Sequence, residues 1–247
     1  MNIKPLFFSI CFTFILTPVS SLFSNTFAGI TVFDNVTTKG KPVKLSASTK
    51  GRIFQEGGKL VEFYLNGKHI GTTLSGGDGI AFLKYTSLSP GIKHLKVKKG
   101  IDKDEGILLV IKKGERIILI EIESTLFEFP FIPNPVGESR ETLTVLTEKF
   151  KLIYVTSLIG AKKSRDWLKK NEYPTSAVLK WNANLLDVLK EQGIKPYTII
   201  GSSAVLSEAS EIEKKFSFEE TENGMRVKDW KELGLRLKEE AEKNGEP

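Results

Sequence analysis

The hydrophobic periodicity of this chain changes near residue 114, and that change sets the strongest limit on its fold. Before it, short runs such as residues 60–65, LVEFYL, alternate apolar and polar positions between turn signals. After it, apolar runs of strand length alternate with segments of helical spacing. Period-two alternation is typical of strands with one buried face, whereas strands that alternate with helices indicate a parallel sheet. The sequence therefore predicts two domains, at residues 29–114 and 115–247.

The opening residues are expected to be a targeting segment rather than part of the fold. Residues 5–19 are almost entirely apolar, and Lys4 precedes them. Small residues stand at the positions that a signal peptidase reads before a cleavage after Ala28. This is the pattern of a secretory signal, here residues 1–28, with a retained membrane anchor as the alternative. The chain beyond residue 28 contains no cysteine, which is compatible with a bacterial periplasmic, secreted or cell-surface protein without disulfides.

The first domain is predicted to be an all-β sandwich. Asn66 and Gly67 supply a two-residue hairpin turn between two alternating runs, and further Gly- and Pro-containing turns follow at regular spacing. The stretch 61–98, with its Phe-Tyr-Leu-Asn-Gly hairpin and its later Pro-Gly-Ile-Lys-His turn, resembles bacterial immunoglobulin-like modules. That resemblance implies an immunoglobulin-like sandwich and says little about function.

The first domain also holds the excess positive charge. Residues 29–115 carry 15 Lys and Arg against 8 Asp and Glu, whereas residues 116–247 carry 20 against 22. Lys93, Lys96 and Lys98 share one predicted strand, which suggests an anionic surface or ligand as partner. The alternative is a solvated edge strand whose lysines oppose pairing with other strands. No aromatic residues interleave these lysines, so no nucleic acid is expected.

The second domain is predicted to be a doubly wound α/β fold with a mostly parallel sheet. Apolar strands at 116–121, 151–156, 176–179 and 197–200 alternate with helical segments, including one that ends over 208–215 and a long one at 228–243. Ligands bind at the carboxyl ends of strands in such sheets. Polar residues follow three of these strands: Glu121-Ile-Glu-Ser-Thr125, Thr156-Ser157 and Gly201-Ser-Ser203.

These strand-end motifs resemble those of the haloacid dehalogenase-like (HAD) superfamily of phosphohydrolases. Tyr154-Val-Thr-Ser-Leu158 followed by Ser164-Arg-Asp-Trp-Leu168 is similar to the lipin-type phosphatidate phosphatases of that superfamily. The resemblance implies a HAD-like (Rossmannoid) domain over residues 115–247. The full predicted fold class is thus an all-β immunoglobulin-like sandwich followed by this α/β domain.

The resemblance also implies a role for each matching residue. Glu121 stands at the position of the nucleophilic Asp, and Glu123 stands at the position of the acid/base Asp. Thr125 and Thr156 match the phosphate-binding hydroxyls, and Lys180 matches the lysine that neutralises the phosphate charge. Glu121 would also be a metal ligand.

The sequence departs from the superfamily pattern at these same positions. Both acids are Glu, whose extra methylene displaces the attacking oxygen by about 1 Å. Ser202, a predicted metal position, and Leu206 stand where carboxylates would hold Mg²⁺, and Lys190 and Lys195 compete with Lys180. We therefore expect a catalytically inactive relative that acts as a binding or scaffold module without a cofactor. The alternatives are an active Mg²⁺-dependent phosphomonoester phosphatase, possibly of the phosphatidate type, and a purely structural spacer.

Overall fold

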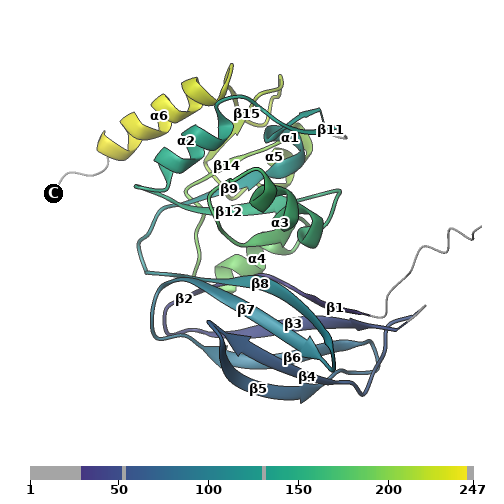
Figure 1. Ribbon diagram of the computed structural model, residues 1–247. Coiled ribbons are helices and arrows are strands. Elements are labelled where there is room, and N and C mark those ends of the chain that lie inside the picture. The colour runs from purple at the N-terminus through teal and green to yellow at the C-terminus, as the bar shows by residue number, and fades with distance from the viewer. Residues whose placement is uncertain (1–28, 52–53, 130–131, 244–247) are drawn as a thin grey trace, which may run out of the picture.

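The computed structural model describes residues 29–51, 54–129 and 132–243, so the predicted targeting segment lies outside the described residues. A β-sandwich, residues 29–111, forms the lower part of the molecule in Figure 1. A sheet covered by helices, residues 117–243 and here called the α/β part, lies above it. Strand residues clearly outnumber helical residues in the described ranges, so the protein is mostly β.

The sandwich consists of two sheets that enclose one hydrophobic core. The smaller has the strand order β1-β3-β6 and the larger has the order β2-β8-β7-β4-β5. Leu45 from the smaller sheet and Phe63 from the larger are fully buried between them. The predicted hairpin turn is confirmed, because Asn66 and Gly67 both have positive φ, at 49° and 80°. The strands are β1 (Gly29–Val32), β2 (Asn35–Thr38), β3 (Pro42–Lys50), β4 (Leu60–Leu65), β5 (Lys68–Leu74), β6 (Ile80–Thr86), β7 (Gly91–Lys99) and β8 (Asp102–Ile111).

The α/β part is organised around a six-stranded parallel sheet with the order β13-β12-β9-β14-β15-β16. The central strand β9 is buried along its whole length, as a continuous apolar run predicts for a parallel strand covered on both faces. A separate antiparallel hairpin, β10-β11, follows it. The strands are β9 (Ile117–Glu121), β10 (Phe127–Phe129), β11 (Ile132–Pro135), β12 (Lys151–Thr156), β13 (Val178–Lys180), β14 (Thr198–Ile200), β15 (Lys214–Ser217) and β16 (Met225–Arg226).

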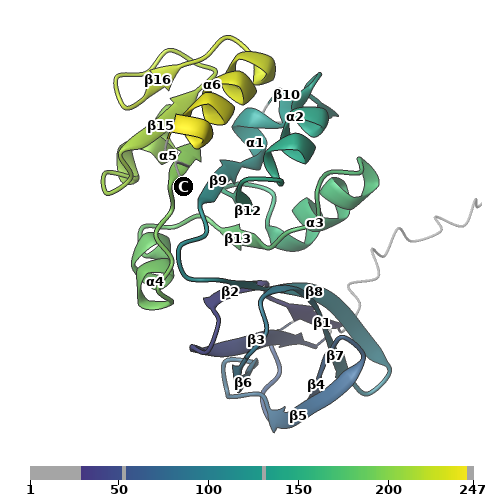
Figure 2. The same ribbon diagram turned by 90° about the vertical axis from the view of Figure 1, so that its left-hand side faces the viewer.

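Helices cover both faces of the parallel sheet, as Figures 1 and 2 show. Leu143 of α2 and Leu237 of α6 pack on one face, and Leu189 of α4 and Leu206 of α5 pack on the other. None of the described helices combines the length and apolar character that crossing a membrane requires. The helices are α1 (Ile122–Thr125), α2 (Ser139–Leu146), α3 (Ala161–Lys170), α4 (Leu185–Glu191), α5 (Ser203–Glu208) and α6 (Trp230–Lys243).

Strand β8 joins the two parts because both of its faces are buried. Leu108 and Val110 point into the core of the sandwich. Ile107, Leu109 and Ile111 point the other way, into a core that they share with β9, α4 and α5. The strand therefore belongs to two hydrophobic cores at once. The domain boundary predicted at residues 114 and 115 stays a prediction, and one of these two cores extends across it.

Hydrogen bonds from the sandwich also cap the carboxyl end of α4. The Thr38 hydroxyl donates to the Gln192 carbonyl at 2.7 Å, and Lys41 Nζ donates to the Glu191 carbonyl at 2.8 Å. The Thr37 hydroxyl donates to the Gln192 side chain at 2.8 Å. The last carbonyls of a helix lack partners within the helix, so these contacts satisfy groups that would otherwise need water.

One predicted helix is wrong at its carboxyl end. The sequence suggested a helix continuing through residues 208–215, but α5 ends at Glu208 and Lys214 begins a strand. Thr198 pairs with Lys214 and Ile200 pairs with Phe216 in parallel register. Sheet pairing and the burial of Phe216 outweigh the helical propensity of the preceding charged residues.

Candidate functional site

Glu121 ends the central strand at the carboxyl edge of the parallel sheet, and its side chain is buried. Its Oε1 accepts a hydrogen bond from the Ser157 hydroxyl at 2.8 Å. Its Oε2 accepts from the Ser124 hydroxyl and from the Ser202 backbone N–H, both at 2.7 Å. A side chain at position 201 would crowd this carboxylate, because a Cβ on Gly201 would lie 3.1 Å from Oε2. Three donors of the chain itself thus hold Glu121 in place.

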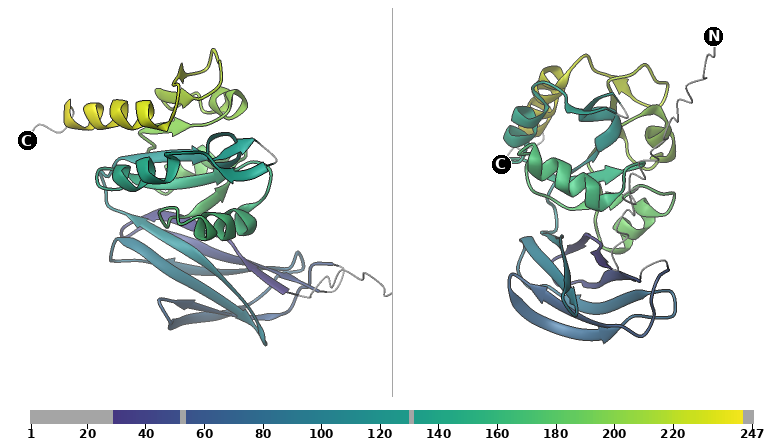
Figure 3. Two further views of the ribbon diagram at one scale, coloured as in Figure 1. Left: turned by 45° about the horizontal axis from the view of Figure 1, so that its top comes forward. Right: turned by 45° about the vertical axis from the view of Figure 1, so that its right-hand side comes forward.

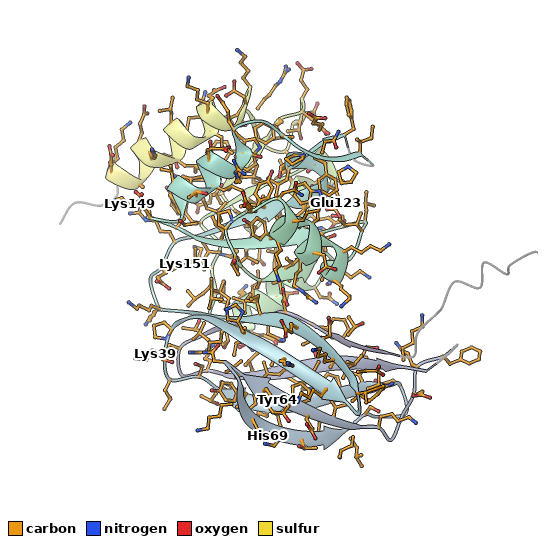
Figure 4. The ribbon with its side chains drawn as sticks, viewed as in Figure 1. Lys39, Tyr64, His69, Glu123, Lys149 and Lys151 are labelled. Carbon is orange, nitrogen blue, oxygen red and sulfur yellow. The ribbon has the colours of Figure 1, made fainter. Side chains whose placement is uncertain are left out.

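Glu123 lies in the one-turn helix α1 and is 2% exposed. Its Oε1 accepts from the backbone N–H groups of Leu158 and Ile159, both at 3.0 Å, and from the Thr156 hydroxyl at 2.5 Å. Its Oε2 accepts from the Ser157 N–H at 3.2 Å. Successive N–H groups that converge in this way form an anion-binding nest. The anion in this nest is the carboxylate of Glu123 itself, which Figure 4 labels beside α1 and α3.

The other predicted site residues lie nearby but do not all meet the glutamates. The Thr125 hydroxyl donates to the Glu121 carbonyl and so closes the turn of α1. Ser202 caps α5, with its hydroxyl accepting from Val205 N–H at 3.5 Å. Lys180 is opposite Thr156 in the sheet register, but its side chain is exposed. Within the described ranges, no ion pair joins Lys180 to Glu121 or Glu123. The phosphate-binding and metal-binding roles of these residues stay predictions.

The contacts of the two glutamates favour a structural role for this edge of the sheet. A carboxylate nucleophile needs an oxygen that faces a substrate, and a metal site needs several oxygens around one point. Here the oxygens face hydroxyl and N–H donors from the loops after β12 and β14. No group of three or more His, Cys, Asp or Glu among the described residues is placed to hold a metal ion.

A second buried carboxylate lies where the sandwich meets the α/β part. The side chain of Asp34, between β1 and β2, has no exposed surface. Its Oδ1 accepts from Ile107 N–H at 2.8 Å and from Arg165 Nη1 at 3.0 Å, and its Oδ2 accepts from Val178 N–H at 2.8 Å. Burial raises the pKa of Asp34 from 3.8 to about 6, against the opposing effects of Arg165 and the two N–H groups. One carboxylate therefore links β8, α3 and β13.

Asp104 extends this network along β8. Its Oδ2 accepts from Val32 N–H at 2.9 Å and lies 3.5 Å from Arg165 Nη2, and its Oδ1 pairs with Lys162. The guanidinium of Arg165 thus lies between two buried carboxylates, and only 11% of its side chain is exposed. A buried ion pair keeps its partners in place because removing one leaves a charge without compensation.

A cleft of about 430 Å³ opens beside this network, between the sandwich and the α/β part. Ile107, Leu168 and Val178 provide its apolar floor. Lys103 from β8 and Lys169 from α3 line it from opposite sides. No hydrogen bond or ion pair joins either ammonium group to another side chain in the described part of the chain. Two free cations thus flank an apolar surface at the joint of the molecule.

The acidic groups of the cleft are mostly engaged. Asp104 is held by Arg165 and Lys162, and Glu105 lies 3.8 Å from Lys96 Nζ. Asp166 on α3 is exposed and lines the same cleft. Because its acids are largely paired while two of its lysines are not, the cleft favours an anionic ligand.

The lysines predicted to attract an anionic partner have contacts within the chain. Lys93 is buried and donates to the Ser89 hydroxyl at 2.8 Å. Lys96 pairs with a glutamate on β8, and Lys98 lies 4.7 Å from the centre of the Tyr64 ring. Figure 4 shows Tyr64 on the outer part of the sandwich, far from the α/β part. The anionic partner predicted for Lys93, Lys96 and Lys98 stays a prediction.

Sequence reasoning missed the residues of the joint. Residues 106–111, GILLVI, lack the alternation of the other sandwich strands, and this run signals a strand buried on both faces. Asp34 and Arg165 carry no such signal, because they are 131 residues apart and belong to no motif. Their meeting depends on how the two parts pack together.

The comparisons with known proteins concern only part of the chain. No family model matches the sequence, and no curated protein matches it. A polysaccharide lyase structure matches with 14% identity and a TM-score of 0.28, covering 34% of this chain and 12% of the lyase. The D00–D0 domain of intimin matches with 16% identity and a TM-score of 0.29, covering 35% and 48%. The M1 domain of titin matches with 16% identity and a TM-score of 0.25, covering 35% and 96%.

These comparisons overturn the predicted membership in the HAD superfamily and the resemblance to lipin-type phosphatases. No family model and no curated protein supports a HAD phosphatase, and no HAD protein is among the structures reported above. The predicted fold class is therefore wrong: the protein is mostly β, and its first part is a sandwich of two sheets. The six-stranded parallel sheet is not evidence for membership in the HAD superfamily, because many unrelated α/β proteins share such a sheet.

The predicted function is wrong for the same reason. It described an inactive phosphatase relative acting as a scaffold, with an active Mg²⁺-dependent phosphatase as the alternative. Both descriptions depended on the HAD assignment, which the comparisons do not support. The strand-end glutamates were interpreted through motif positions, whereas their contacts show two carboxylates held by loop hydroxyls and N–H groups.

Proposed function

We propose that the protein is a ligand-binding module that holds an acidic organic molecule in the cleft between the sandwich and the α/β part. The observation that carries this proposal is the cleft itself, about 430 Å³ in volume and formed by both parts. Ligand sites of this size are common at the interfaces between structural units. The export predicted from residues 1–28 to the periplasm or cell surface belongs to the same proposal.

The lining of the cleft supports the class of ligand. Lys103 and Lys169 offer ammonium groups that no other side chain among the described residues neutralises. Between them, the floor of Ile107, Leu168 and Val178 suits an apolar body such as a ring. A carboxylate attached to a ring would bring its charge to the lysines and its ring to the floor.

Differential thermal unfolding tests the proposal directly. A ligand that binds only the folded state raises its melting midpoint by mass action. Phenylacetate is expected to raise the midpoint in a saturable way, and the neutral phenylacetamide is expected to do so much less. Lys103→Glu and Lys169→Glu should each remove most of the phenylacetate effect. Lys231→Glu, an exposed lysine on α6 far from the cleft, is the matched control and should leave it unchanged.

Two results would contradict this assignment. One is an equal effect of phenylacetate and phenylacetamide, because the charge of the ligand would then be irrelevant. The other is an unchanged phenylacetate effect in both cleft variants, because the binding surface would then lie elsewhere.

A further inference from the structure

One end of the sandwich exposes four large apolar side chains. Phe54 is 78% exposed, Leu60 is 58%, Leu74 is 59% and Ile101 is 99%. We call these four residues the apolar tip. Single exposed apolar residues are normal on protein surfaces, but a group of them gathered at one place marks an interaction site.

The strand register places all four residues at the same end. Leu60 begins β4 and lies directly opposite Leu74, which ends β5. Glu62 lies opposite Lys98 near the end of β7, so Leu60 neighbours the β7–β8 turn. Ile101 occupies that turn.

Lys99 ties the loop that carries Phe54 to the same end. Its Nζ donates to the Lys50 carbonyl at 3.2 Å and lies 3.7 Å from a carboxylate oxygen of Glu56. Residue 54 lies between these two partners in the chain. The apolar tip therefore lies at strand ends from both sheets, and Figure 3 shows the strands of the sandwich extending beyond the α/β part.

Basic residues surround the apolar tip with a small excess of positive charge. Lys99 and Lys59 neutralise Glu56, and Lys99 also lies 3.5 Å from Asp102. The ammonium group of Lys50 has no ion pair in the described ranges, and Lys103, which lines the cleft, follows the β7–β8 turn two positions after Ile101.

A further acid at this end is engaged with the backbone. The Asp78 carboxylate in the β5–β6 turn accepts a hydrogen bond from the Ile80 N–H at 2.9 Å. Exposed apolar side chains next to free lysines form the combination that binds an interface between lipid tails and anionic head groups.

The path of the chain also points to a lipid surface as the partner of the apolar tip. Gly29 begins β1 opposite Lys50, so the described chain starts at the apolar tip, as Figure 1 shows. The preceding 28 residues include the almost entirely apolar run 5–19. An apolar sequence thus joins the protein at the end where the folded surface is also apolar. We propose that the apolar tip docks onto a lipid bilayer with anionic head groups, inserting Ile101 and Leu60 below them.

Vesicle binding tests the proposal with the chain from Gly29 onward, which contains every described strand and helix and lacks the apolar run. Cosedimentation with vesicles of phosphatidylcholine and phosphatidylglycerol gives the partition coefficient. Ile101→Glu is expected to lower it about tenfold, because it removes an inserted apolar side chain and adds a charge. Leu88→Glu is the matched control, since Leu88 is 76% exposed in the turn at the opposite end of the sandwich.

Lys50 has a separate signature. Lys50→Glu is expected to weaken binding to vesicles that contain phosphatidylglycerol and to have little effect with phosphatidylcholine alone. Circular dichroism melting checks that each variant is folded. The variants are expected to fold because the substituted side chains are exposed.

Three results would overturn the proposal. The first is a failure of the unsubstituted chain to bind either kind of vesicle. The second is an equal loss of binding in Ile101→Glu and in Leu88→Glu. The third is sedimentation velocity showing a dimer that Ile101→Glu dissociates while vesicle binding is absent, because the tip would then be an interface between two copies.

Discussion

Raising the pH from 4 to 7 is expected to remove the stabilisation that Asp34 provides when it is protonated. The carboxyl titrates near 3.8 in the unfolded chain, and burial raises its pKa to about 6 in the folded protein. Between these values the folded state binds a proton that the unfolded state does not. The contribution is therefore fully present below pH 3.8 and is lost as the pH rises through 6. A shift of about two units corresponds to about 3 kcal/mol.

Urea unfolding at several pH values, on the unsubstituted protein and on Asp34→Asn, measures this contribution. Asparagine does not titrate, and the other ionisable groups largely cancel in the difference between the two proteins. The free energy of unfolding of the unsubstituted protein, relative to the variant, should fall by about 2.4 kcal/mol from pH 4 to pH 7, because part of the full contribution of about 3 kcal/mol is already lost at pH 4. The neighbours Arg165 and Asp104 are present in both proteins.

Asp166→Asn is the control for this experiment, because Asp166 lies on the same helix as Arg165 but is exposed. Comparing the two variants tests whether the pH dependence requires a buried carboxyl. A flat or rising curve for Asp34→Asn would refute the reasoning, because burial would then not dominate over the ion pair and the hydrogen bonds that favour the ionised form.

Three further predictions concern the joint and the strand-end site. Leu109→Ala should destabilise the protein by about 2–5 kcal/mol. The three tryptophans all lie in the α/β part. Unfolding in urea followed by their fluorescence and by far-UV circular dichroism should show the same destabilised transition, and two separate transitions would contradict a shared core. Glu123→Gln should cost about 1–3 kcal/mol in urea unfolding, because an amide NH₂ cannot accept from the nest, and an unchanged midpoint would count against the nest. Thr38→Val should cost about 1 kcal/mol and speed amide exchange in residues 185–192; unchanged exchange would mean that the cap on α4 is not significant.

Local patterns were enough to predict much of the secondary structure. The Asn66-Gly67 hairpin followed from residues that tolerate positive φ, and the buried strand β9 followed from a continuous apolar run. Placing Glu121 at a strand end followed from the same run. These features depend on neighbours in the sequence, so a single sequence contains the information that specifies them.

The contacts of the site could not be predicted in the same way. Glu123 accepts from a loop more than 30 residues later, and Asp34 meets Arg165 across the joint. Motif matching assigned both glutamates to phosphoryl chemistry because it compared positions along the chain. Which donors surround a carboxylate depends on loop geometry and packing, and this information is absent from the spacing of two acids.

The double burial of β8 has a consequence for the order in which the newly made chain can fold. The sandwich strands are complete once residue 111 has left the ribosome, but Ile107, Leu109 and Ile111 then have no partner on their outer face. The residues that cover this stripe extend to Ile212, about a hundred positions later. During synthesis the sandwich therefore exposes an aggregation-prone apolar surface. In that interval the chain would depend most on a chaperone or on the secretion machinery to prevent aggregation.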